Sequence, residues 1–521
     1  MRKSLLLLLA ILPLSLFARR YDEVRTSSDL DINVEATGAV GTGDNLPYLL
    51  TQNRQGVLSP QGSQGYLRAT ADYAYRRNKF HVGAGADVIG YASTHYDYYR
   101  SAVYLQQLYA EVGYGKYYLE LGSHEDKGNF VDPTLSSGNM IWSGNSRPVP
   151  GVRFGTRDFV SMVILANVFE AKVDCSFGMM LDGDYNNARF DQYTDGQGGL
   201  LRASGVDGAW IHRKSLFFRS TSQQPFYVTV GAEHVALYGG TIRHRDGDWD
   251  DAQGIDGRNT CSVVTYEQTG KWGNALTGGD GDPNDALNHA FAIDLRLDLN
   301  RPGFAIGLYK QHYADDLNAS SFRHLADGLW GLELRLKRFR WLNHIVVEYL
   351  CSDAQGDDTE ALRQLTQGEA PDADDYASDF YQDQRFGGYA YYGMACGNSL
   401  LTSPVYNTDG YTGYSWNIVR ALQLAFEGQA TARLSYRCKL AHLTSDGTPW
   451  GIALNNLSGT PQASRSATSL LIEASYATKG GLSLTPAVAF DSGKLYGSNF
   501  AVCLTARYTF GSHHSDYKYN D

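Results

Sequence analysis

The chain has 521 residues, a formal net charge of −11 and a mean hydropathy of −0.34, so it is polar as a whole. This acidic balance argues against nucleic acid as a partner, because phosphate backbones are bound by clustered Lys and Arg. The 56 glycines and 36 tyrosines, beside only 14 prolines and 6 methionines, are typical of a protein built from strands and turns.

The first 18 residues predict a secretory signal peptide. A basic start at Arg2 and Lys3 precedes an apolar run from Leu5 to Phe17, and the small residue Ala18 follows. A buried N-terminal helix fits this charge and length pattern less well, and the run is too short for a spanning helix. No later apolar run reaches the roughly 18 residues that a membrane helix needs. We therefore expect an exported protein without membrane helices.

Segments in which apolar and polar residues alternate recur along the whole chain. The clearest is FAIDLRLDL, residues 291–299, which places Phe291, Ile293 and Leu295 on one face and Asp294 and Arg296 on the other. The same alternation occurs at residues 31–40, 65–75, 332–337, 430–440 and 500–510. A period of two indicates strands with two chemically different faces.

The lengths of the segments favour a transmembrane barrel over a soluble β-sandwich. They run for about nine to eleven residues, the length with which a tilted strand crosses a bilayer. Their polar faces carry charges of both signs, which suits a hydrated lumen. The sandwich remains the alternative, since its strands alternate too.

The connections between the strands give an independent test, because outer-membrane barrels alternate short periplasmic turns with long external loops. Eight short connections are predicted at 76–78, 115–116, 165–167, 221–225, 301–303, 338–342, 427–429 and 478–481. Nine long ones lie between them, at 41–64, 92–101, 125–151, 182–207, 240–288, 314–327, 352–415, 444–466 and 491–499. This pattern predicts an all-β fold, a transmembrane antiparallel β-barrel of about 18 strands. The cuts near 165 and 340 are the weakest, and without them the count is sixteen.

The barrel is expected to span residues 19–510 and to be followed by a polar C-terminal tail, residues 511–521. The last strand, residues 500–510, must pair with the first, because an unpaired backbone group in hydrocarbon costs several kcal/mol. Residues 357–369 could form a short helix, either as part of a plug in the lumen or as a cap over a long loop.

Four segments carry a resemblance to a known family: NLPYLLTQNRQGVLSP at 45–60, LSSGNMIWSGNSRPVPGVRFGT at 135–156, GAEHVALYGGT at 231–241 and FGGYAYYGMACGNSLLTSPVYN at 386–407. They resemble recurrent segments of the Wzi family of outer-membrane capsule-assembly proteins. The resemblance implies a barrel partly plugged by loops and short helices, which acts without catalysis as a lectin for capsular or other exopolysaccharide. It leaves open whether the capsule-export machinery docks at the periplasmic turns.

The candidate polysaccharide-binding residues are chosen from the predicted external loops, since aromatic rings stack on sugar faces and guanidinium groups bind hydroxyls and acidic sugars. They are Trp142, Arg147, Trp249, Trp272 and Trp450. For each Trp the alternative is packing inside a folded loop, and Arg147 could instead pair with a loop acid.

The remaining motifs do not predict a cofactor, a metal site or a catalytic group. The acidic runs at 245–254 and 279–288 lack the Gly and Glu that complete a calcium loop, so we interpret them as solvated charges. The six cysteines do not have the spacing of metal ligands. In an exported protein, one or two pairs of them could be oxidised to disulfides.

Three functions follow as hypotheses. We expect a monomer in outer-membrane lipid whose external loops bind polysaccharide at the cell surface. A porin-like diffusion channel is the alternative, because lumen-facing Arg and Asp set the selectivity of porins. A barrel enzyme is the weakest hypothesis, since the sequence offers no recognisable set of Ser, His and acid.

Overall fold

The computed structural model describes residues 24–95, 102–126, 128, 130–162, 168–192, 205–238, 240–243, 249–251, 288–314, 325–355, 359–368, 379–383, 387–459 and 463–518. The predicted signal peptide, residues 1–18, lies outside this part. None of the described helices has the length and apolarity to cross a membrane.

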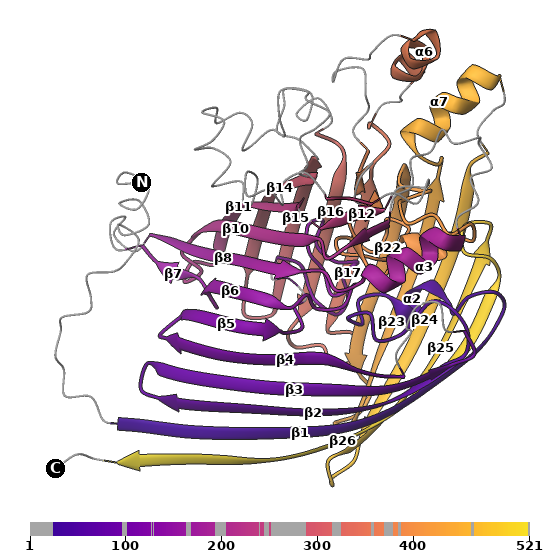
Figure 1. The fold of residues 1–521 in the computed structure, drawn as a ribbon. Helices are drawn as coiled ribbons and strands as arrows, with labels where there is room; N and C mark the ends of the chain where they lie inside the picture. The colour runs from indigo at the N-terminus through magenta and orange to yellow at the C-terminus, as the bar shows by residue number, and fades with distance from the viewer. Residues whose placement is uncertain are drawn as a thin grey trace.

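The fold is a closed antiparallel β-barrel (Figure 1). One continuous sheet contains β1 Val24–Thr42, β2 Gln64–Arg77, β3 Phe80–Ser93, β4 Val103–Tyr114, β5 Tyr117–Ser123, β6 Gly151–Thr156, β7 Val160–Ser161, β8 Phe169–Met179, β10 Trp210–Ser220, β11 Phe226–Tyr238, β14 Asn288–Asn300, β15 Phe304–Ala314, β16 Gly328–Leu336, β17 His344–Cys351, β22 Val419–Gln429, β23 Leu434–Ser445, β24 Arg465–Ala477, β25 Leu482–Gly493 and β26 Asn499–Lys518. Because β6 and β7 both pair with β8, they share one position, and the 19 strands occupy 18 positions. The predicted barrel and its strand number are confirmed.

The barrel closes where the last strand pairs with the first. The register of β1 and β26 runs from Val24 opposite Lys518 to Thr42 opposite Phe500. The sequence predicts that the last strand ends at Phe510, whereas β26 continues through residues of the predicted tail to Lys518. The reason is that β1 already begins at Val24, so the extended chain finds backbone partners beyond Phe510. These outermost pairs need no apolar face, which is why the alternation does not reveal them.

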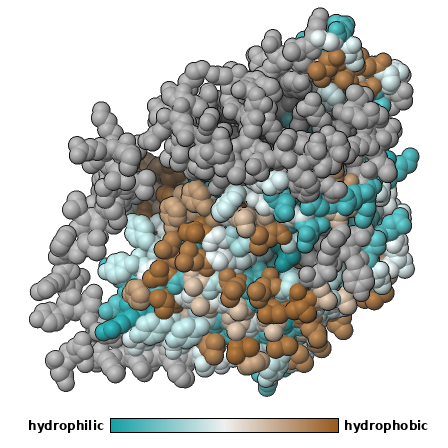
Figure 2. Space-filling view, viewed as in Figure 1, coloured by the Kyte–Doolittle hydropathy of each residue, from teal (hydrophilic) through white to brown (hydrophobic). Residues whose placement is uncertain are grey.

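The two faces of the strands differ as the alternation predicts. On β26, Phe500 and Leu504 point outward and are 47% and 52% exposed, whereas the lumen-facing Ala501 and Cys503 are 0% and 2% exposed. Figure 2 shows apolar side chains gathered over the strand wall. The outward apolar face also excludes the soluble β-sandwich. A sandwich buries the apolar faces of its strands between two sheets, whereas the wall of this barrel turns its apolar face outward.

The connections alternate in length around the barrel. Turns such as 221–225, 301–303 and 478–481 have the predicted bounds, and they lie at the same end of the barrel as the start of β1 and the end of β26. We call this the short-turn end and the opposite one the long-loop end. The long-loop end carries α2 Tyr48–Thr51, α3 Gly183–Gln192, α6 Thr359–Gln367, α7 Pro449–Ser458, η4 Pro404–Tyr406 and the short strands β9 Gly205–Asp207, β12 Thr241–Arg243, β13 Trp249–Asp251, β18 Gln382–Asp383, β19 Gly387–Gly388, β20 Ala390–Tyr391 and β21 Met394–Ala395.

The short helix predicted within residues 357–369 is present as α6. It packs against α7, and the Asn456 amide donates a hydrogen bond of 3.1 Å to the Thr359 hydroxyl. In Figure 1 the pair stands above the strands, so α6 caps the long loops and takes no part in a plug. Among the described cysteines, which are Cys175, Cys351, Cys396, Cys438 and Cys503, all are free thiols.

Candidate functional site

Three long loops fold into the barrel and form a plug, which we define as the described residues of 43–63, 124–150 and 379–418. Its apolar side chains are buried, among them Leu50, Met140 and Leu400 at 0% exposure. Direct hydrogen bonds join the three loops: the Ser399 carbonyl accepts from the Tyr48 hydroxyl at 2.5 Å, and the Ser399 hydroxyl donates to the Ser137 carbonyl at 2.6 Å. The plug is therefore one packed unit, as the prediction of a loop or short-helix plug requires.

The plug is hydrogen-bonded to lumen-facing side chains around most of the barrel. These wall partners are Arg68 of β2, Gln106 of β4, Arg153 of β6, Arg213 of β10, Arg296 of β14, Gln311 of β15, Arg335 of β16, Glu348 of β17, Gln423 of β22, Glu473 of β24 and Asp491 of β25. A loop that hung freely in a water-filled pore would not need partners on so many strands. The polar side chains of the lumen, which made a channel one of the hypotheses, thus bind the plug loops.

Asp126 illustrates how the wall holds the plug by charge. One of its carboxylate oxygens lies 3.0 Å from the Arg153 guanidinium and 3.4 Å from that of Arg213. Burial would raise the pKa of Asp126, but these two guanidinium groups hold it well below its usual range. The carboxylate is therefore ionised at any physiological pH, and the two arginines fix this part of the plug to β6 and β10.

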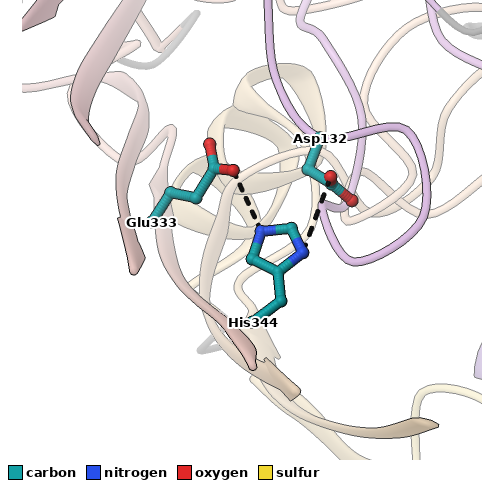
Figure 3. A group of neighbouring side chains, drawn as sticks. All are labelled: Asp132, Glu333 and His344. Carbon is teal, nitrogen blue, oxygen red and sulfur yellow. Dashed lines mark hydrogen bonds and ion pairs between the residues drawn. The ribbon is translucent and has the colours of Figure 1, made fainter. Parts of the chain in front are cut away.

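A second anchor joins the plug residue Asp132 to β16 and β17, and Figure 3 shows its three central side chains. The His344 Nε2 atom lies 2.9 Å from a Glu333 oxygen, and its Nδ1 atom lies 3.8 Å from an Asp132 oxygen. The three side chains are close enough to surround a metal ion. However, Arg335 binds both carboxylates and Arg296 binds Glu333, so cations of the protein already occupy the oxygens that a metal would need.

Trp142, the first predicted sugar-binding residue, is buried in the plug at 5% exposure. The Arg213 guanidinium of β10 lies 3.9 Å from the centre of its ring. This corresponds to the alternative left open by the sequence, packing inside a folded loop. The sequence could not reveal this stacking, because Arg213 belongs to a strand whose register was unknown.

Arg147, in contrast, lies at the long-loop end between two aromatic rings. Its guanidinium carbon is 4.2 Å from the centre of the Tyr104 ring and 4.5 Å from that of Tyr392, and all three side chains are partly exposed. We call these three residues the long-loop platform. Tyr104 is the second residue of β4 and Tyr392 belongs to the third plug loop, so the platform joins segments that are far apart in the sequence.

The loop at Tyr392 is held in an unusual conformation. Tyr392 has φ of 51° and the next residue, Gly393, has φ of 73°. An added Cβ on Gly393 would lie 2.2 Å from the Tyr185 hydroxyl of α3. The buried carboxyl of Asp182 accepts a hydrogen bond from the Tyr392 amide at 3.0 Å, and burial raises the pKa of Asp182 to about 6. Such backbone strain persists only where surrounding contacts enforce it.

A second stack at the same end was not predicted. The Arg465 guanidinium, at the start of β24, lies 4.4 Å from the centre of the Trp416 ring. Arg465 is exposed and Trp416 is partly buried. Trp416 directly follows the predicted loop 352–415, and because the candidates were chosen from the loops themselves, it was not among them.

The structure does not bring the other three candidates together with Arg147. Trp450 belongs to α7 and is partly buried, and no described residue accepts a hydrogen bond from its indole N–H. The backbone of Trp249 pairs with Arg243 between β13 and β12, and its side chain lies outside the described part. Trp272 and most of the acidic runs also lie outside it.

Comparisons with known proteins place the fold among outer-membrane barrels. No protein-family model and no curated protein matches the chain. Among solved structures it is similar to Wzi, an outer-membrane protein involved in group 1 capsule assembly in Escherichia coli and described as a carbohydrate-binding β-barrel. The identity is 11%, over 92% of this chain and 84% of that chain, with a TM-score of 0.52.

Weaker similarity links the chain to two Occ proteins. OccAB2 of Acinetobacter baumannii is 10% identical over 93% of this chain and 98% of that chain, with a TM-score of 0.46. OccK5 (OpdH) of Pseudomonas aeruginosa is 9% identical over the same shares, with a TM-score of 0.44. At such identities the comparisons establish the fold alone: this chain is an outer-membrane-type β-barrel, and its membership of the Wzi family remains a prediction.

Proposed function

We propose that this protein is a non-catalytic outer-membrane β-barrel that binds capsular or other exopolysaccharide at its long-loop end. By the general rule for such barrels, this end faces outward and the short turns face the periplasm. The observation that carries the proposal is the combination of a plugged lumen with partly exposed arginine–aromatic stacks at the long-loop end.

The chemistry of the stacks suits a sugar chain. An aromatic ring offers its face to the C–H groups of a pyranose, and a guanidinium beside it can bind hydroxyls or a carboxylate with two parallel hydrogen bonds. A stacked guanidinium also keeps its orientation, so less rotamer entropy is lost on binding. The similarity to a carbohydrate-binding barrel agrees with this proposal, although it rests on fold alone.

The test is binding of purified, detergent-solubilised protein to the exopolysaccharide of its own cells. We expect Arg147→Ala and Arg465→Ala each to weaken binding about tenfold, equivalent to about 1.4 kcal/mol. Arg340→Ala is the matched control, because Arg340 also stacks on a tryptophan, Trp341, at 5.9 Å but lies at the short-turn end. Equal losses in all three variants, or no binding by the wild type, would exclude the proposal.

A diffusion channel remains the competing function, and the contacts of the plug weigh against it. The described plug loops form hydrogen bonds or ion pairs with eleven strands of the wall. These strands are β2, β4, β6, β10, β14, β15, β16, β17, β22, β24 and β25. A plugged barrel is expected to be silent in a planar bilayer.

A further inference from the structure

A chamber of about 430 Å³ lies in the lumen between the plug and the short turns. Phe130 and the plug residues that follow it line one side, and Phe130 stacks on the wall residue Phe217 with ring centres 5.8 Å apart. The other lining residues include Tyr227 and Asn300, which adjoin the turns 221–225 and 301–303. Its volume falls within the range of about 300–1,000 Å³ that is usual for small-molecule sites.

Most charged groups of the chamber are already paired with one another. Arg296 binds Asp298 at 3.0 Å and Glu333 at 2.7 Å. Arg219 binds Glu170 at 2.5 Å, and its guanidinium lies 3.9 Å from the centre of the Phe159 ring. These pairs leave their guanidinium groups little capacity for a further ligand.

The chamber nevertheless carries an excess of positive charge. Its lining cations are Lys172, Arg219, Arg296, Arg335 and Lys337, and its lining carboxylates are Asp132, Asp298 and Glu333. The bonded neighbours of these groups, Glu170 beside Arg219 and His344 beside Glu333 and Asp132, leave the excess of cations in place. Lys337 is satisfied by two neutral oxygens, those of the Asn300 side chain and the Arg301 carbonyl.

Lys172 is the group that the protein leaves unsatisfied. It lies on the lumen face of β8 opposite Phe217, lines the chamber and is only 7% exposed. Within the described ranges no residue accepts a hydrogen bond from its ammonium group or forms an ion pair with it. The two acids that flank it on the same face of β8, Glu170 and Asp174, are bound by Arg219 at 2.5 Å and by Arg153 at 2.9 Å. The chamber is the open side of this largely buried side chain, and an anion there would give the ammonium group a partner.

We propose that this chamber binds a small monocarboxylate of the size of an acidic mono- or disaccharide, with Lys172 as the partner of its carboxylate. The excess of cations favours an anionic ligand, and a carboxylate can pair with the Lys172 ammonium. Phe130, Phe159, Phe217 and Tyr227 line the same space, so the chamber offers apolar surface beside the lysine. This site lies on the other side of the plug from the long-loop platform, and it does not depend on the proposed polysaccharide binding.

The experiment is calorimetric titration of the full-length protein in detergent with D-glucuronate, D-glucose and inorganic phosphate. We expect glucuronate to bind, glucose to bind more weakly, and high salt to reduce the affinity for glucuronate. Lys172→Gln should weaken glucuronate binding by at least tenfold. The matched control is Lys439→Gln, because Lys439 is also a lumen-facing lysine at 7% exposure but does not line this chamber.

Each outcome decides the assignment. Loss of binding in Lys172→Gln with retention in Lys439→Gln supports it. No binding of glucuronate, equal binding by Lys172→Gln, or tighter binding of phosphate than of glucuronate would overturn it. The heat-dependent gel mobility of folded barrels shows whether each variant has folded. Binding of exopolysaccharide by Lys172→Gln, measured in parallel, separates failure of this site from failure of the long-loop platform.

Discussion

Replacement of Glu348 by Ala tests whether the plug closes the barrel. Glu348 lies on β17, is 0% exposed and accepts hydrogen bonds from the Ser137 amide at 2.7 Å, the Tyr309 hydroxyl at 2.7 Å and the Ser136 hydroxyl. Each buried donor left without a partner costs about 1–3 kcal/mol. Three such donors, partly rehydrated, give a loss of about 3 kcal/mol. At about 1.4 kcal/mol per factor of ten, the equilibrium between the seated and unseated loop shifts by about 100-fold.

The assay is single-channel conductance in a planar bilayer. We expect wild-type protein to be silent and Glu348→Ala to show brief openings, because the strand hydrogen bonds of the wall are untouched while the loop is loosened. Glu35→Ala is the control, since Glu35 of β1 accepts from Tyr66 of β2 at 2.6 Å and lies 3.6 Å from Arg507 of β26, all of them wall residues. Steady conductance of the wild type, or a Glu348→Ala protein as silent as Glu35→Ala, would refute the reasoning.

Three further predictions concern the wall, the plug and the platform. Leu504→Arg places a charge on the outward face and should destabilise the barrel in lipid vesicles by about 2–4 kcal/mol, whereas Thr505→Arg, one residue further on the lumen side, should cost less in the same denaturant titration. Asp132→Asn should weaken the anchor to Arg335, and its effect should depend on pH. Burial would raise the pKa of Asp132, but hydrogen bonds from Leu135 and Thr134 and the charge of His344 lower it. The contribution of Asp132 to stability is therefore fully present above the unfolded pKa of about 3.9. It is lost as the pH falls through the lower pKa of the folded state. Limited proteolysis of loop 124–150 should therefore accelerate below about pH 4 in the wild type. In Asp132→Asn the rate of proteolysis should change less with pH. Gly393→Ala should cost about 1–3 kcal/mol through its φ of 73° and its clash with Tyr185, and should reduce exopolysaccharide binding without altering the heat-dependent gel mobility of the barrel.

The wall of the barrel was predictable because its physics is local. Each strand must turn one apolar face to lipid, so a period of two appears in the sequence wherever a strand crosses. Turns such as 301–303 carry Pro and Gly and interrupt that period, which fixes their bounds. The end of β26 escaped prediction because pairing outside the bilayer requires only a backbone partner, and β1 supplies one down to Val24.

The site was predictable only in part, because its contacts join residues that no local pattern relates. Arg147 was identified from its residue type and its loop, but its partners Tyr104 and Tyr392 lie on other segments. Lys172 stands on the polar side of an ordinary alternating strand, and nothing in the sequence distinguishes it from the paired Arg153 or Arg219. Its isolation becomes evident only when the neighbouring strands are in register and the plug is in place.

A polar lumen face is equally compatible with a channel and with a plugged binder, because both need charges that point inward. The difference lies in what those charges bind. In a channel they remain solvated and face the permeating solute, whereas here Arg153, Arg213 and Arg335 bind Asp126 and Asp132 of one loop, and Glu348 binds the backbone of the same loop. A loop held at four points on β6, β10, β16 and β17 crosses the lumen between distant strands of the wall. The plug thereby separates the long-loop end, which carries the arginine–aromatic stacks, from the chamber near the short turns, which carries Lys172, and a ligand bound at one end meets the plug before it can reach the other.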